Sequence, residues 1–393
     1  MKPRIFFAII FIQILVTVII FFQIRNRSFS TFNISGNKYE NERIQESLAT
    51  NNSSYALHPY LGFVLDYGID PNSNKFGFNG QDITFKNNSN DYIVGIFGGS
   101  VAQIYYAEEK DNFIKELNSR LKNKNIKVYS FALGGYKQPQ QLMTLQYLLA
   151  LGYKFDLIIN IDGFNEAALP FSENYQDNVS TYFPRGWILY STQYFDKSTI
   201  SLINTINYLK SIKNFFTKLP SNLVYFPNII VNSLYNKSEL NLDKRLNQIM
   251  KTYQTKGPEP YMDKSENGIE QDIVNVWYNS SLQMARIAKS NNIQYLEFLQ
   301  PNQYLPNSKH FSQEELNKYV NINHPYAYAS KEIYPKIIER LPELKENGVS
   351  IYDLTNIFIN EYGSIYNDNC CHYNERGFSL MTKNIIPTIK VNY

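Results

Sequence analysis

The sequence predicts an α/β fold in which a parallel sheet is covered by helices on both faces. Three observations predict it: short apolar runs recur along the chain, helical patterns separate them, and the runs are nearly continuous in apolar residues rather than alternating. A continuous apolar strand is buried on both faces, as in parallel sheets whose crossover helices cover both sides. The expected architecture is therefore three layers, α/β/α, with five parallel strands.

The predicted strands and helices alternate from residue 91 onward. Each strand is a short apolar run that ends in polar or glycine residues, and each helix has apolar residues every three or four positions. The predicted strands cover 93–97, 126–133, 156–163, 293–300 and 349–354, and the predicted helices cover 102–121, 138–151 and 273–290. Before them, 58–68 and 74–83 are predicted as short extended pieces punctuated by Gly and Pro.

The N-terminus carries an apolar segment long enough to cross a membrane. Ile5–Phe22 contains eighteen residues without a charge, with basic residues on both flanks. As a helix it rises about 27 Å at about 1.5 Å per residue, close to the thickness of a hydrocarbon core. Because "FFQIRNRSFS" offers no small-residue cleavage site, an uncleaved anchor is expected. A cleaved signal peptide and a buried helix are the alternatives.

The chain is expected to have three parts: a transmembrane anchor at 1–25, a polar linker at 26–57 and one large domain at 58–393. A single span with a short N-terminal tail favours an extracytoplasmic location for the large domain. An insertion at about 168–265 interrupts the strand–helix rhythm. Inside it, 200–219 shows an apolar helical stripe with lysines among it, which fits a helix packed on the domain core or one lying on a membrane surface.

Composition excludes several classes of function. The 38 basic and 35 acidic residues nearly balance, which gives no case for a nucleic-acid partner. The only cysteines, Cys370 and Cys371, are adjacent, and the four histidines are scattered, so neither a disulfide framework nor a metal site is expected. No cofactor is expected. Outside the cytoplasm the two cysteines form either a vicinal disulfide or two thiols.

Polar or glycine-rich residues end each of the first three predicted strands. These are "GGS" at 98–100, "LGGYKQPQQ" at 133–141 and "DGFNEA" at 162–167. Ligands of open parallel sheets bind beyond the carboxyl ends of the strands, so the three segments are expected to meet in one crevice. Near the C-terminus, "DNCCHYNERG" at 368–377 places an Asp four residues before a His.

Together these segments supply the parts of a serine hydrolase. Ser100 would be the nucleophile, His372 its general base, and Asp368 the carboxylate that orients the imidazole. The backbone N–H groups of Ser100 and Gly135, with the side-chain amide of Asn165, would form an oxyanion hole. Taken alone, a serine after two glycines is more typical of a helix N-cap.

In this order the segments resemble the sequence blocks of the SGNH (GDSL-type) hydrolases, over roughly 90–390. "FGGSVA" resembles the block of the nucleophile, Ser100, and "ALGGYKQPQQL" the block whose glycine, Gly135, carries an oxyanion N–H. "IDGFNEA" resembles the block with Asn165, and "DNCCHYNERG" the block with His372. "HPYLGF", "FGFNG" and "FLQPN" add a softer likeness to membrane-anchored bacterial members. The resemblance implies a flavodoxin-like sheet of order 2-1-3-4-5 and an acyl-enzyme mechanism.

Two positions depart from the family pattern. Gly99 stands where the family usually has Asp, and Asp368 precedes His372 by four residues rather than three, so that Asn369 occupies the usual acid position. The alternative fold is the α/β-hydrolase, because Gly98-x-Ser100 begins a G-x-S-x-G motif. Ala102 at the final glycine position of that motif argues against it.

The resemblance implies a serine esterase that removes an O-acyl group, acetyl above all, from a cell-surface glycan or lipid. Two alternatives remain open. The same residues would serve an O-acyltransferase acting on an exported polysaccharide, if water were excluded. The second alternative is a catalytically inactive glycan-binding protein of the cell envelope.

Overall fold

The computed structural model describes residues 55–83, 88, 90–176, 179–187, 197–256 and 265–391. The predicted anchor and most of the predicted linker lie outside the described residues. No helix within the described ranges has both the length and the apolar character that crossing a membrane requires. The chain divides into two compact units, a sheet domain over Ser54–Trp187 and Tyr261–Tyr393, and a helical unit within Ile188–Pro260.

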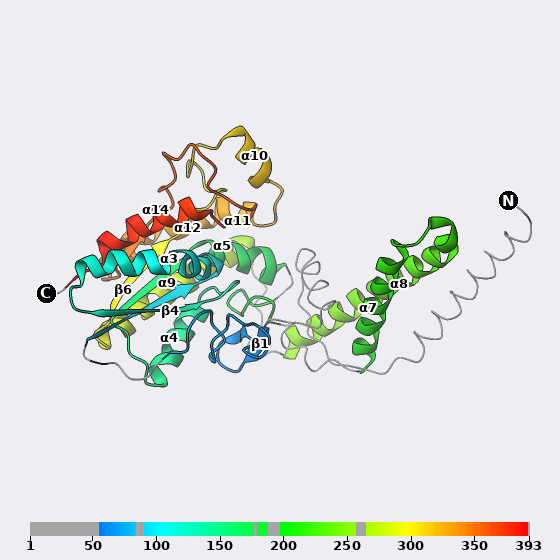
Figure 1. The fold of residues 1–393 in the computed structure, drawn as a ribbon, viewed down its shortest axis with the longest axis horizontal. Coiled ribbons are helices and arrows are strands. Elements are labelled where there is room, and N and C mark those ends of the chain that lie inside the picture. Colours follow the sequence, from blue (N-terminus) through cyan, green and yellow to red (C-terminus); the bar gives the residue numbers. More distant parts are fainter. Residues whose placement is uncertain are drawn as a thin grey trace, which may run out of the picture. The chain divides into compact units, whose positions relative to one another are not determined.

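The sheet domain is built on a five-stranded parallel sheet, which lies among helices in Figure 1. Its strands are β3 (Asp91–Gly98), β4 (Asn125–Ala132), β5 (Leu157–Asp162), β6 (Gln294–Leu299) and β7 (Ile351–Asp353). Neighbours in the order β4-β3-β5-β6-β7 pair in parallel. The expected order 2-1-3-4-5 numbered the predicted strands from residue 93 onward and did not include β1 and β2, which form a separate sheet. When all strands are numbered from the N-terminus, the observed order is 4-3-5-6-7 and differs from the expected one.

Helices cover the sheet on both faces and complete a three-layer α/β/α arrangement. They are α3 (Ser100–Arg120), α4 (Gln140–Ala150), α5 (Phe164–Leu169), the π-helix η1 (Pro170–Tyr175), α9 (Glu266–Ser290), α14 (Glu375–Ile385) and the 3₁₀ helix η3 (Ile386–Thr388). The Thr382 hydroxyl of α14 bonds Tyr105 at 3.1 Å and Glu109 at 2.8 Å on α3. Helix α9 packs against α4 and α5. The five predicted strands and three predicted helices match β3 to β7, α3, α4 and α9 to within a few residues, except that α9 begins seven residues before its predicted start at 273. The remaining helices in this set, α5, η1, α14 and η3, were not predicted.

Four short helices between β6 and β7 have no counterpart in the sequence prediction. They are α10 (Gln313–Tyr319), α11 (Ala327–Glu332), α12 (Tyr334–Glu339) and α13 (Leu341–Glu346). Each is six or seven residues long. A helix of two turns shows too little periodicity to be recognised from sequence.

A β-hairpin packs on the loop that follows β4. Strand β1 (Tyr55–His58) pairs antiparallel with β2 (Gly62–Leu65), so the sheet domain begins inside the predicted linker. The hydroxyl of Tyr136 donates to the Phe63 carbonyl at 2.6 Å, and the Gln140 amide donates to the Leu61 carbonyl at 2.9 Å. The hairpin thereby holds the segment that follows Gly135.

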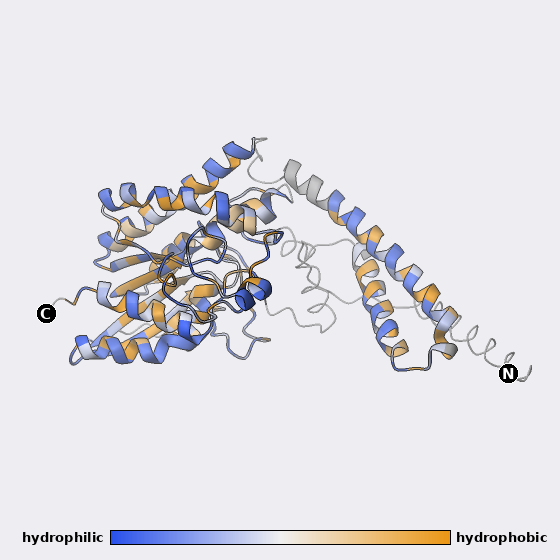
Figure 2. Cartoon of the chain, turned by 90° about the horizontal axis from the view of Figure 1, so that it is seen from above, coloured by the Kyte–Doolittle hydropathy of each residue, from blue (hydrophilic) through white to orange (hydrophobic). Residues whose placement is uncertain are grey.

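The helical unit is a hairpin of α7 (Lys197–Phe216) and α8 (Ser221–Lys256), seen in Figure 2. The helix predicted at 200–219 corresponds to α7, whereas the length of α8 was not predicted. The buried core of the unit comes from both helices: Ile206, Leu209, Phe216, Val224, Val231 and Tyr235. The apolar stripe of α7 therefore packs on α8.

Candidate active site

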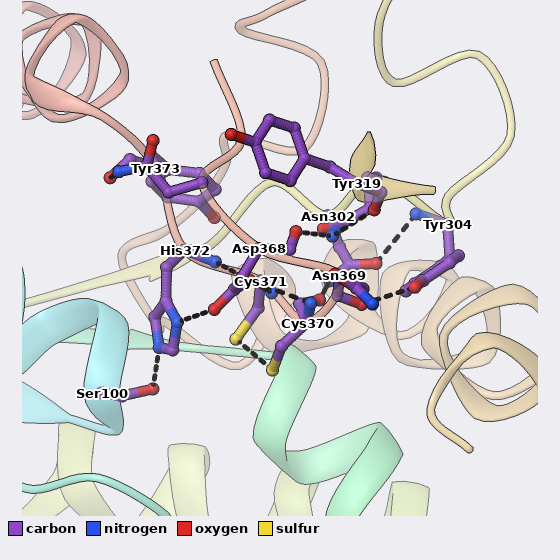
Figure 3. Close-up of polar contacts among 12 residues, drawn as sticks. Ser100, Asn302, Tyr304, Tyr319, Asp368, Asn369, Cys370, Cys371, His372 and Tyr373 are labelled. Carbon is purple, nitrogen blue, oxygen red and sulfur yellow. Dashed lines mark hydrogen bonds and ion pairs between the residues drawn. The ribbon is translucent and has the colours of Figure 1, made fainter. Parts of the chain in front are cut away.

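Ser100 lies at the turn from β3 into α3. Strand β3 ends at Gly98, Gly99 is the N-cap of α3, and Ser100 is its first helical residue. No side chain caps this helix end, so Ser100 is not the N-cap that a lone serine after two glycines suggests. Its Oγ lies instead 2.8 Å from Nε2 of His372. Figure 3 draws this contact as a dashed line.

Close neighbours leave no room for a side chain at either of the two glycines before Ser100. Gly98 has φ of 142°, and a Cβ there would lie 2.2 Å from the Ile161 carbonyl oxygen. A Cβ on Gly99 would lie 2.0 Å from Nδ2 of Asn165. Both distances are far shorter than any van der Waals contact, so the missing side chains make room for the adjacent strand and for the Asn165 amide. The glycine that departs from the family pattern at position 99 thus has a steric reason.

The imidazole of His372 is held from its other side by Asp368. Its Nδ1 contacts Oδ2 of Asp368 in a short hydrogen bond. The second carboxylate oxygen, Oδ1, accepts the backbone N–H groups of Cys370 at 2.9 Å, Cys371 at 3.0 Å and His372 at 3.2 Å. The chain from Asp368 to His372 therefore turns around the carboxylate, and this turn accommodates the additional residue in the Asp–His spacing. Asn369 is exposed, and the two imidazole nitrogens bond Asp368 and Ser100 instead of its side chain.

The charge of Asp368 follows from these contacts. Burial raises its pKa, but the hydrogen bond to His372, the imidazole charge and the N–H groups of Cys371 and Cys370 outweigh burial and lower the pKa to about 2. The carboxylate is therefore ionised at neutral pH. An ionised acid on Nδ1 favours the tautomer whose Nε2 can accept a proton from Ser100.

Three consecutive side chains after β6 support the turn around Asp368, and sequence reasoning did not assign them a role. Asn302 donates to the Cys370 carbonyl at 3.0 Å, Gln303 to the Asp368 carbonyl at 2.9 Å, and Tyr304 to the Asn369 carbonyl at 2.5 Å. Asn302 and Tyr304 are labelled in Figure 3. The position of this segment at the carboxyl end of a parallel strand is the signal that could have singled it out. These side chains fix the backbone on which the acid and the base are carried.

The two ends of the loop that carries Asp368 and His372 are also held in place. Tyr366 and Tyr373 form an isolated antiparallel bridge on either side of it. Oε1 of Glu315 accepts the N–H groups of Ile365 at 2.8 Å and Tyr366 at 3.1 Å. Its other oxygen pairs with Lys309 at 2.7 Å, and both side chains are fully buried. A buried pair with all oxygens bonded holds its backbone partners firmly.

Asn165 and the glycine loop after β4 border the serine. Asn165 is the second residue of α5, is 7% exposed, and donates from Nδ2 to the Tyr136 carbonyl at 2.7 Å. A Cβ on Gly134 would lie 3.9 Å from Cβ of Ser100. Gly135 is buried with φ of 83°, and a Cβ there would lie 2.7 Å from Cδ of Arg185. The structure therefore places this loop and Asn165 beside Ser100 and its helix turn.

Buried polar groups also hold the loop that follows β4, which contains Gly135. Lys137 is fully buried and donates to the carbonyls of Thr181 at 2.6 Å and Phe183 at 2.7 Å. Burial lowers the pKa of Lys137 to about 7. The Glu166 carboxylate accepts the N–H groups of Gly163 at 2.6 Å and Gln138 at 3.1 Å, so it ties the turn of Asn165 to the loop of Gly135.

Cys370 and Cys371 lie between the acid and the base. Both are thiols in the structure, with their Sγ atoms 2.8 Å apart. Burial raises the pKa of the Cys371 thiol well above its usual value. A thiol that stays protonated is a poor nucleophile, which argues against Cys371 as a nucleophile at this site.

Two buried carboxyl groups, Asp162 on β5 and Glu297 on β6, lie close together in the sheet. Glu297 on β6 accepts from the hydroxyls of Ser281 at 2.6 Å and Tyr295 at 2.8 Å. Burial raises the pKa of Glu297 to about 7, and burial together with the charge of Glu297 raises that of Asp162 well above its usual value. Burial therefore shifts both carboxyls toward the protonated form in the folded protein.

Replacing Glu297 by Gln is expected to weaken the pH dependence of folding stability. A folded pKa above the unfolded one contributes stability that is complete below about pH 4.5 and is lost as the pH rises toward about 7. Urea unfolding at pH 5 and pH 8 measures the effect, and the difference in free energy of unfolding should shrink by about 3 kcal/mol. An unchanged difference would show that Glu297 titrates alike in both states.

If Ser100 and Asn165 act as the sequence predicts, Gly99→Ala is expected to lower kcat for an ester by about 10²- to 10³-fold with little loss of folded structure, because its Cβ displaces the Asn165 amide. Gly363→Ala is the matched control, since no atom lies within 4 Å of a Cβ there. Ester hydrolysis and thermal unfolding are measured for both. The loss should not add to that of Asn165→Ala in the double variant, and additive losses would contradict the displacement.

No family model and no curated protein matches the sequence. Among solved structures, the chain is similar to a GDSL-like lipase from Bacteroides thetaiotaomicron, with 11% sequence identity and a TM-score of 0.36. The match covers 78% of this chain and 92% of that chain. At this identity and TM-score the likeness assigns no activity to the chain.

Proposed function

We propose that the protein is a serine hydrolase that cleaves an O-acyl ester through an acyl-enzyme on Ser100. The observation that carries the proposal is the continuous relay from Oγ of Ser100 through both nitrogens of His372 to the carboxylate of Asp368. A base within hydrogen-bond reach of a serine hydroxyl, itself oriented by an ionised acid, is the arrangement that activates serine as a nucleophile.

The first half of the reaction forms the acyl-enzyme. His372 Nε2 takes the proton of the Ser100 hydroxyl while Oγ attacks the ester carbonyl carbon. The tetrahedral intermediate collapses, its C–O bond to the alcohol breaks, and the imidazolium returns the proton to the leaving alkoxide. In the second half, water attacks the acyl carbon with His372 as base, and the acid product leaves Ser100 free. Asp368 remains ionised throughout and stabilises the imidazolium.

The negative oxygen of the tetrahedral intermediate needs donors beside Ser100. We assign this role to the backbone N–H groups of Ser100 and Gly135 and to the Asn165 amide. One N–H of that amide donates to the Tyr136 carbonyl, and the amide has a second hydrogen to donate. Because Gly99 has no side chain, Nδ2 of Asn165 can lie against the residue before Ser100, which supports this assignment. Donors held in place by buried contacts stabilise developing charge without reorganisation.

The proposed substrate is an O-acyl ester, with acetyl as the acyl group, on a cell-surface glycan or lipid. The proposed location is the outer side of the cell membrane, through the apolar segment at 5–22. The substrate class and the location both rest on the sequence and its resemblance to membrane-anchored hydrolases. The same relay would also transfer the acyl group to a sugar hydroxyl if the acceptor excluded water from the acyl-enzyme.

A fluorophosphonate probe tests the proposal, because it reacts only with an activated serine. The wild-type protein should be labelled at Ser100, and Ser100→Ala should not be labelled. Ser290→Ala, a change at an exposed serine of α9, is the matched control and should be labelled like the wild type. An unlabelled wild-type protein would favour a binding protein without activity. Release of acetate from an acetylated sugar, compared with transfer to a second sugar, separates hydrolysis from transfer.

A further inference from the structure

The outward face of α8 is apolar although it does not pack on α7. Val224, Val231 and Tyr235 form the buried face of the helix. On other positions, Tyr225 is 61% exposed and Phe226 58% exposed. We define the hairpin-tip patch as these two residues with Ile229, Ile230 and Phe215, which are also exposed. Four of its five members lie within two turns of α8, so they form one continuous surface.

A surface of this kind is unusual on a helix that faces water. Large exposed side chains are common singly, but a contiguous apolar patch marks a surface that another apolar phase covers. Tyr225 and Phe226 contact each other edge to face, with ring centroids 5.3 Å apart, and so present a joined aromatic surface. The helix is therefore apolar on its core side and on its outer side at the end where α8 begins.

The charges within the segment that carries the patch have a single sign, and the first acid after it is Glu239. The stretch from Lys197 to Ser238 contains five lysines and no Asp or Glu. Lys218 is exposed in the turn between α7 and α8. Lys237 is exposed and follows Phe226 and Ile230 at helical spacing, so these three residues share one stripe of the helix. Cationic side chains thus border the apolar residues.

We propose that the hairpin-tip patch docks on an anionic lipid surface. Aromatic and aliphatic side chains enter the boundary of the acyl chains, while lysine stems reach along them and place the ammonium groups at the headgroup phosphates. The negative potential of such a surface attracts each lysine near it. The same chemistry disfavours a second copy of the chain as the occupant. In a symmetric contact the lysines would face lysines, with no acid in the stretch to neutralise them.

Site-specific photocrosslinking of the full chain tests the proposal. Benzoylphenylalanine replaces Phe226 in one variant and, as the matched control, the 76% exposed Tyr362 of the sheet domain in another. Each variant is reconstituted in vesicles of phosphatidylcholine alone or with added phosphatidylglycerol, then irradiated and analysed by peptide mass. A lipid adduct is expected at position 226 and not at 362, with a higher yield when phosphatidylglycerol is present. The control position accounts for any membrane attachment elsewhere in the chain.

Charge variants test the electrostatic part. Lys218→Gln and Lys237→Gln should each lower the adduct yield at position 226 about fivefold in the anionic vesicles. Lys289→Gln and Lys345→Gln, exposed in the sheet domain, should leave it unchanged. Thermal unfolding checks that each variant is folded. Equal yields at 226 and 362, or no response to phosphatidylglycerol, would overturn the proposal. A protein–protein adduct at 226 in place of the lipid adduct would assign the patch to a second chain instead.

Discussion

Ser100→Ala is expected to lower kcat for a short acyl ester by about 10⁴-fold or more. The variant lacks the Oγ that His372 would deprotonate, and the protonated Cys371 thiol is a poor replacement for it. Hydrolysis of p-nitrophenyl acetate measures the effect. KM should change little, since the serine hydroxyl contributes more to the transition state than to substrate binding.

The loss has to be separated from a loss of folding. Ser100 is only partly buried, and its side chain does not cap α3, so alanine should leave the free energy of unfolding nearly unchanged. Urea unfolding of the variant checks this. Cys371→Ser in the same assay excludes Cys371 as the nucleophile if it retains activity, and Cys370→Ser does the same for the other thiol. An active Ser100→Ala protein would end the serine hydrolase proposal.

The five strands could be predicted because each is a continuous apolar run, and burial on both faces demands that composition. The hairpin of β1 and β2 was predicted only as extended pieces. It depends on contacts with distant residues, such as the bond from Tyr136 to the Phe63 carbonyl. Helix α8 contains Pro227 and many polar residues, which weaken the sequence signal for so long a helix. Because α8 is stabilised by packing on α7, its length could not be predicted from its own sequence.

The residues of the site also divide into those that local sequence predicts and those that depend on contacts between distant segments. Ser100, Gly135 and Asn165 stand at the ends of predicted strands, so the rule for parallel sheets singled them out. Alone, Ser100 was best explained as a helix cap, and the structure gives that position to Gly99. The reason for glycine at 99 lies in Asn165, more than sixty residues away in the chain. Such steric reasons become visible only when the elements are placed side by side.

The spacing between acid and base was the least regular feature of the sequence. A four-residue separation could leave Asp368 out of reach of the imidazole or bring Asn369 into the acid position. The structure resolves this through the turn, in which three N–H groups converge on Oδ1 of Asp368 and leave Oδ2 for His372. Support for the turn comes from Asn302 and Tyr304 on a different segment.

Asp368→Asn is therefore expected to lower kcat by about 10⁴-fold, whereas Asn369→Ala should retain most of the activity. An amide in place of the carboxylate can present its NH₂ to Nδ1, which favours the tautomer whose Nε2 carries a proton and cannot accept one from Ser100. Ester hydrolysis at neutral pH measures both variants. Because the pKa of Asp368 is about 2, its charge should not limit the rate of the wild-type protein above about pH 4.

Stability provides a second readout for the same pair of variants. The pKa of Asp368 is lower in the folded protein than in the unfolded chain, so its contribution to stability is complete above about pH 4 and is lost as the pH falls toward 2. Asp368→Asn should remove this part of the acid sensitivity, and Asn369→Ala should preserve it. If Asn369→Ala loses activity while Asp368→Asn keeps it, the acid of the relay has been assigned to the wrong residue. If both retain activity, the turn orients His372 through its backbone without a side-chain acid.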